Sequence, residues 1–146
     1  MAVSIIRLAP SLKLLEKLEM SKELKGPCKA CPWRKDSAKG WLGTSTPIEF
    51  LEQSEAELRM PCHLHVDYDR EDWREQAQEA PQCAGRAVHM ANRCKLPRNP
   101  ELIVAKPDRE TVFSNPQEFV DHHTLSADKP QVMIVLGQVR VVGFKS

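Results

Sequence analysis

The chain of 146 residues has the length of one ordinary domain. Its 41% apolar and 28% charged residues exclude wholesale disorder, and a formal net charge of +1 excludes a general electrostatic attraction to nucleic acid or membrane. We find no secretory signal and no apolar run of the roughly 18 residues that a membrane span needs, so the sequence predicts a cytoplasmic protein that does not bind membranes.

The first predicted element is an amphipathic helix over residues 11–25, where leucines recur at helical spacing and Ser11 is a suitable N-cap. Gly26-Pro27 ends this helix. An irregular segment from residue 28 to residue 46 follows, interrupted by proline and glycine. The expected role of the helix is to cover part of the core.

Two later segments carry the signature of a helix start, in which a capping residue precedes proline and a glutamate follows. Thr46 and Glu49 flank the first proline and predict a helix to about residue 58, while Asn115 and Glu118 flank the second and predict a shorter helix. In such a start the cap side chain accepts a hydrogen bond from an early helical amide.

Two more helices are expected between these. Residues 70–79 are helical in pattern but very polar, which is typical of a surface helix, and residues 83–94 return to an apolar stripe. Cys94 follows Cys83 by 11 residues, or three helical turns. We therefore expect Cys94 to face inward as a small buried hydrophobic side chain rather than to bind a ligand.

The C-terminal stretch Gln131–Val142 is rich in Val and Ile. Gly137-Gln138 is predicted to be the two-residue turn of a β-hairpin, with glycine in the first position.

The most informative pattern is a set of four cysteines with 2, 30 and 20 intervening residues: Cys28, Cys31, Cys62 and Cys83. A Cys-x-x-Cys turn can direct two thiolates at one ion, and two further cysteines can complete a tetrahedral site. Cys83 also stands at a predicted helix start, where the helix dipole stabilises a thiolate. A disulfide framework is disfavoured because the cysteine count of five is odd and the compartment is reducing.

The sequence leaves Zn²⁺ and a [4Fe-4S] cluster open as the bound species, and we prefer zinc. His63 and His65 stand beside Cys62, favour zinc and could replace one cysteine as a ligand. A cluster accepts scattered cysteines and often has proline after a ligand, as Pro32 follows Cys31. The same proline excludes haem attachment, which needs histidine in that place.

These observations predict a small α+β, helix- and loop-rich domain organised around a four-cysteine metal centre, with a short C-terminal β-hairpin. The expected organisation is an N-terminal helical extension over residues 1–25, a metal-binding core over residues 26–96 and a C-terminal α/β extension over residues 97–146.

The function expected from this pattern is that of a non-enzymatic, metal-binding regulatory or interaction module, because a closed four-ligand site leaves no position for a substrate. Its partner could be nucleic acid, contacted by basic side chains, or a protein, bound through the acidic segment 67–79. The candidate basic contacts are Arg34, Lys35, Arg86 and Arg93.

The alternative is a metal- or cluster-dependent redox or hydrolytic enzyme that uses His63 or His65 near the centre. The sequence holds no phosphate-binding loop, no His-Glu-x-x-His and no deaminase signature. It therefore leans against an enzyme.

Three short motifs resemble those of a known family. They are Cys28-Lys-Ala-Cys31-Pro-Trp-Arg34, Cys62-His63 and Cys83-Ala-Gly85. In this order they are similar to the hallmark of an uncharacterised group of small phage and bacterial proteins, over roughly residues 26–95. The resemblance implies that the four cysteines act together on a metal or cluster, and that the protein works in a bacterial cytoplasm, the host's if a phage encodes it. It implies no activity, and the acidic insert before Cys83 is longer than the family pattern.

Overall fold

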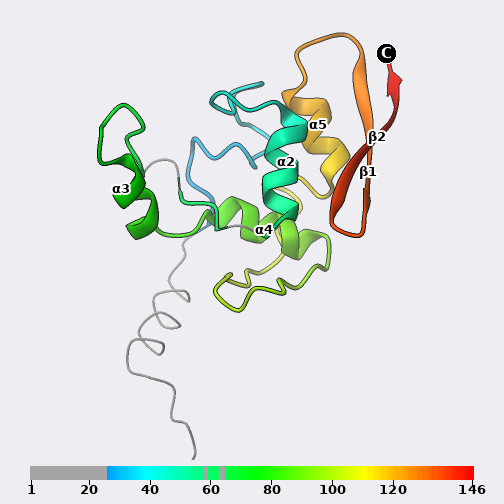
Figure 1. Ribbon diagram of the computed structural model, residues 1–146. Helices are drawn as coiled ribbons and strands as arrows, with labels where there is room; N and C mark the ends of the chain where they lie inside the picture. The colour runs from blue at the N-terminus through cyan, green and yellow to red at the C-terminus, as the bar shows by residue number, and fades with distance from the viewer. Residues whose placement is uncertain (1–25, 58, 63–64) are drawn as a thin grey trace, which may run out of the picture.

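The computed structural model describes residues 26–57, 59–62 and 65–146 (Figure 1). Within these ranges the chain forms four helices and one two-stranded antiparallel sheet, which makes it a small α+β fold. The helix predicted over residues 11–25 lies outside the described residues. In the described ranges no helix has the length and apolar character needed to cross a membrane.

The two helices predicted from capping signals are confirmed. Helix α2 spans Pro47–Glu55, and the Thr46 hydroxyl accepts the Glu49 amide while the Glu49 carboxylate accepts the Thr46 amide. This reciprocal pair satisfies two amides that a helix start leaves without partners. Helix α5 spans Pro116–His123 and begins in the same way, with the Asn115 side chain accepting the Glu118 amide at 2.9 Å.

Helices α3, Trp73–Glu79, and α4, Ala84–Asn92, differ in burial as their sequences predicted. Helix α3 has no buried residue, whereas most of α4 is buried. The prediction for Cys94 is wrong, because this residue is exposed. Since α4 ends at Asn92 and Cys94 takes a positive φ of 54°, the helical face that would have turned Cys94 inward does not extend that far.

Strands β1, Lys129–Val135, and β2, Gln138–Lys145, form the predicted hairpin. Its two-residue turn is Leu136-Gly137, one position earlier than predicted, and both residues have positive φ, 51° and 74°. Two successive positive φ values define the type I′ turn, whose twist matches that of the strands. The prediction placed glycine first, as in a type II′ turn, whereas the structure has glycine second, which type I′ turns favour, and leucine first.

The core is centred on Trp33, which has no exposed surface. Its indole stacks on His89 of α4 at 4.7 Å and packs against Phe119 of α5 at 4.6 Å. The Trp33 carbonyl accepts the Phe113 amide at 3.2 Å, so the cysteine-bearing loop is bound to the segment that leads into α5. Helices α2 and α5 lie between this region and the hairpin (Figure 1).

Candidate metal centre

The thiols of Cys31 and Cys83 are in contact, with 4.0 Å between their sulfur atoms. Both side chains belong to the core, at 1% and 6% exposure. Cys31 closes a tight turn in which its amide donates to the Cys28 carbonyl at 3.1 Å. Cys83 is the N-cap of α4. Two cysteines that are 52 residues apart in the sequence therefore meet inside the protein.

Backbone pairing brings Cys62 to the same place. The Cys62 amide donates to the Pro81 carbonyl at 2.8 Å, and the Cys83 amide donates to the Met60 carbonyl at 2.9 Å. This exchange forms a short antiparallel bridge and places Cys62 and Cys83 on adjoining strands of chain. The acidic segment between them is thus a loop that starts and ends at the centre.

Cys28 completes the group of four. Burial raises the pKa of the Cys28 thiol, and the neighbouring Cys62 and Cys83 raise it further. The Cys62 side chain acts on the Cys28 thiol most strongly among its neighbours, so the two thiols lie close together. The predicted ligands therefore stand as two adjacent thiol pairs, Cys28 with Cys62 and Cys31 with Cys83. As they are placed, no three His, Cys, Asp or Glu residues of the described ranges form a ready metal site.

One thiol of the buried pair is prepared to be a thiolate. The hydrogen bond from Cys31 lowers the pKa of Cys83, and the amides of Gly85 and Arg86 at the start of α4 lower it further. The same hydrogen bond, with burial, raises the pKa of Cys31. Of the two thiols, Cys83 is thus the one that more readily becomes a thiolate, with Cys31 as its hydrogen-bond donor.

Gly85 allows α4 to approach the Cys31 turn. A Cβ atom at this position would lie 2.2 Å from the Cys31 sulfur and 3.0 Å from the Trp33 Cβ. No real Cβ is accommodated at 2.2 Å, so only glycine fits without moving the sulfur. The glycine of the Cys-Ala-Gly motif is therefore explained by close packing against a thiol.

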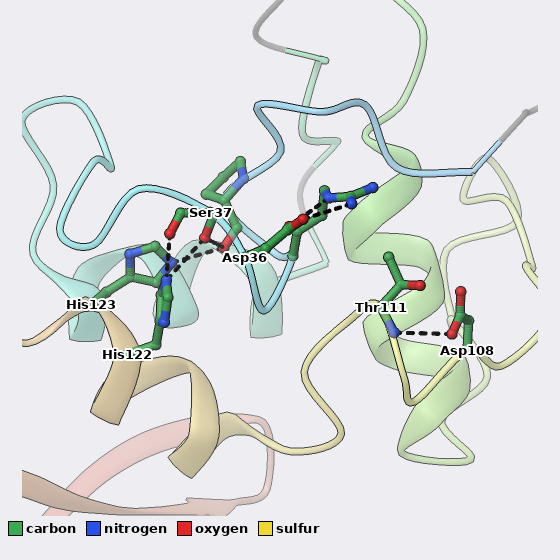
Figure 2. Close-up of polar contacts among 8 residues, drawn as sticks. Asp36, Ser37, Asp108, Thr111, His122 and His123 are labelled. Carbon is green, nitrogen blue, oxygen red and sulfur yellow. Dashed lines mark hydrogen bonds and ion pairs between the residues drawn. The ribbon is translucent and has the colours of Figure 1, made fainter.

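His123 holds the loop that follows Cys31 (Figure 2). Its Nδ1 accepts the Gly40 amide at 3.1 Å, so Nε2 carries the proton and donates to the Pro32 carbonyl at 2.8 Å. Burial lowers the pKa of His123 to about 4, which keeps the ring neutral and fixes this tautomer. A histidine of α5 thereby positions the residue next to Cys31.

Ser37 and His122 lie 3.2 Å apart, Oγ to Nε2, a spacing that a nucleophile and its base would share (Figure 2). The same Nε2 lies 2.8 Å from the Ser37 carbonyl oxygen, which can only accept. Nε2 must therefore carry a proton and donate it, so it has no lone pair for the hydroxyl. The Ser37 hydroxyl donates instead to the Pro32 carbonyl at 3.3 Å. The pair fastens the loop and lacks the base that catalysis would need.

The four basic residues that were predicted as nucleic-acid contacts differ in exposure and in pairing. Arg34 forms a two-pronged ion pair with Asp36 (Figure 2), and Lys35 is exposed. Arg93 is mostly buried against Glu55. Arg86 has no exposed surface at all, so it is not available for contact with a phosphate outside the protein.

The two histidines considered as ligands are not brought into the centre by any described contact. His63 lies outside the described residues. His65 is exposed, and its amide donates to the Cys62 carbonyl at 2.9 Å.

No family model, no curated protein and no solved structure matches this chain. The interpretation of the centre therefore rests on its own residues.

We expect Gly85→Ala to destabilise the protein by roughly 3 kcal/mol or more, at the upper end of overpacking costs, because the new methyl group collides with the Cys31 sulfur. Urea unfolding followed by circular dichroism measures this. Gly143→Ala is the matched control, since its Cβ would meet only the end of the Gln131 side chain at 3.2 Å. Equal stability of the two variants would contradict the close approach of α4 to the Cys31 turn.

Stability should fall as the pH is lowered from about 6.5 to about 4. Burial lowers the pKa of both His89 and His123 to about 4, whereas unfolded histidine titrates near 6.5. Below pH 6.5 the histidines of the unfolded chain bind protons, whereas the buried rings of the folded chain stay neutral. Each ring therefore lowers the free energy of unfolding by up to about 3 kcal/mol by pH 4. An NMR titration of the His89 and His123 rings tests this directly. A ring of either residue that titrates near 6.5, the value of unfolded histidine, would contradict it.

Proposed function

We propose that this protein is a metal-stapled interaction module in which Cys28, Cys31, Cys62 and Cys83 hold one tetrahedral metal ion. The observation that carries the proposal is the buried thiol contact between Cys31 and Cys83 at 4.0 Å, with Cys28 and Cys62 beside it. When bound, the ion would supply folding energy by joining segments far apart in the chain.

The spacing of the sulfur atoms favours zinc over an iron–sulfur cluster. Zinc–sulfur bonds of about 2.3 Å in a tetrahedron place neighbouring sulfurs roughly 3.8 Å apart. The 4.0 Å between Cys31 and Cys83 is close to that edge. A [4Fe-4S] cluster binds each cysteine to a different iron and holds the ligand sulfurs much farther apart. A cluster would therefore require these two segments to separate.

The surroundings of the thiols also fit a bound cation. The amides of Ala30, Trp33 and Gly85, each two residues after a cysteine, favour the thiolate forms of Cys28, Cys31 and Cys83 respectively. Hydrogen bonds to ligand sulfurs are a usual support of such centres. Four thiolates would close the coordination sphere, which supports a structural role over an enzymatic one.

The acidic lobe, defined as residues 67–79, supports a protein partner in preference to nucleic acid. It holds six Asp or Glu residues against two Arg, and its helix α3 has no buried residue. The lobe projects away from the other helices and the hairpin (Figure 1). Tyr68 and Trp73 pack together on it at 5.6 Å, and Tyr68 is 55% exposed. Such a surface suits a basic partner with an apolar contact at its centre. That the chain comes from the phage and bacterial family with the same motifs stays a prediction.

Protein purified without oxygen should be colourless and contain one zinc per chain. Serine in place of Cys28, Cys31, Cys62 or Cys83 should remove the zinc and unfold the protein or leave it far less stable, because each change removes a ligand. Elemental analysis and thermal unfolding measure both effects. Cys94→Ser is the matched control, since that thiol is exposed and outside the group.

A brown sample that contains iron and sulfide would show that the same cysteines bind an iron–sulfur cluster instead of zinc. A folded protein that binds no metal, or a Cys94→Ser variant that loses the metal as the others do, would overturn the proposed centre.

The protein should not bind duplex DNA at low salt, and should bind a polylysine peptide with an affinity that falls as salt is added. Reversing Glu71, Glu75 and Glu79 to Lys should abolish peptide binding. Reversal of Glu101 and Glu110, exposed acids outside the lobe, serves as the control. Fluorescence anisotropy with labelled DNA and labelled peptide measures the binding of the wild type and of both variants. DNA binding with a steep salt dependence, or equal peptide binding by both variants, would contradict the acidic lobe as the partner surface.

A further inference from the structure

Arg86 is a buried cation with an unused hydrogen-bond donor. Its side chain has no exposed surface, and it lies in the first turn of α4, three residues after Cys83. The guanidinium donates from Nε to the Ser54 hydroxyl at 3.2 Å and from Nη2 to the Ser54 carbonyl. Nη1 has no partner among the described residues. A buried charge held only by neutral groups is costly unless an anion lies close by.

The carboxylates nearest to Arg86 are already engaged elsewhere. Glu55 uses one oxygen to accept Arg93 and the other to accept Lys95. Glu57 accepts backbone amides through its Oε2. Arg86 itself forms no ion pair with a described residue, so neither glutamate neutralises it directly.

The remaining group that acts on Arg86 is Cys83, three residues before it at the start of α4. Burial lowers the pKa of Arg86, and among the groups that oppose this effect Cys83 acts more strongly than Glu57 or Glu55. The influence is mutual, because Arg86 also lowers the pKa of Cys83 through both its charge and its amide. Arg86 therefore favours the thiolate form of Cys83, and a thiolate at Cys83 favours the charged form of Arg86.

The other buried polar atoms without partners in the described ranges do not carry a charge. They are the indole nitrogen of Trp33, Nε2 of His89 and the hydroxyl of Thr124. Of the unpartnered atoms, only Nη1 of Arg86 belongs to a cation. Arg34 also acts on Cys28 and Cys31, but its guanidinium is already paired with Asp36.

We propose that Arg86 is the charge-compensating residue of the metal centre, a fully buried cation three residues after Cys83 whose Nη1 donor is unused. This inference rests on the proposed function. Four thiolates around Zn²⁺ leave two negative charges in a buried site, and a fixed cation in the second shell offsets part of that charge. Second-shell partners of this kind tune metal affinity without touching the metal.

The test compares the zinc affinity of the wild-type chain with that of Arg86→Gln, Arg86→Lys and Ser54→Ala, by competition with a chromogenic chelator. Removing the charge in Arg86→Gln should weaken zinc binding about 10- to 100-fold. Arg86→Lys keeps the charge and should stay within a few-fold of wild type. Ser54→Ala removes one anchor but keeps the cation, so it should lower thermal stability and leave the affinity unchanged.

If Arg86→Gln binds zinc with the same affinity as Ser54→Ala, Arg86 is only a packing residue and the inference is overturned. If Arg86→Gln fails to fold even with zinc, Arg86→Lys decides: a folded variant with near wild-type affinity supports charge compensation, and a variant that has lost zinc overturns it. Failure of the proposed function is seen separately, as a wild-type chain that binds no zinc.

Discussion

The contact between the thiols of Cys31 and Cys83 is the constraint on which the rest of the structure depends. To form it, α4 must approach the Cys31 turn so closely that no Cβ fits at Gly85. That approach also places Trp33, two residues after Cys31, against the same glycine, where the indole becomes the centre of the core. In a chain with only 5% aromatic residues, one close approach thus organises both the thiols and the hydrophobic cluster.

Two neutral histidines join this centre to the irregular segments around it. The Nδ1 of His89 lies 2.7 Å from the Phe113 carbonyl, and Nε2 of His123 lies 2.8 Å from the Pro32 carbonyl. Each ring also adds to the aromatic cluster, His89 on Trp33 and His123 against Phe119. Burial keeps both rings uncharged, so they serve as flat, partly polar core residues. The histidine side chains thereby provide hydrogen-bond partners for loop carbonyls that no regular backbone pairing satisfies.

The features that could be predicted from the sequence are local ones. The capping box at Thr46 acts within four residues, and the cysteine spacing predicted the grouping that supports the proposed centre. Features that depend on distant segments could not be predicted. Pro32 and His123 are 91 residues apart, and nothing near His123 marks it as a support for the loop. The sequence shows that Arg86 lies one helical turn after Cys83, but the burial of Arg86 depends on its contact with Ser54 in another helix. The sequence alone therefore predicted Arg86 to be an exposed basic residue.

The same backbone bridge that brings Cys62 to Cys83 also isolates the acidic lobe. The bridge clamps the two ends of the lobe by hydrogen bonds between residues 60–62 and 81–83, so the chain between them can change without moving the thiols. The buried anchors Val66 and Ala80 stand at its two ends, and helix α3 between them stays on the surface. The proposed centre and the proposed partner surface thus meet at the bridge and at the adjoining Arg59, which donates to the carbonyls of Ala77 and Gln78 in the lobe. A long insert at this place fits a division in which the metal stabilises the fold and the lobe selects the partner.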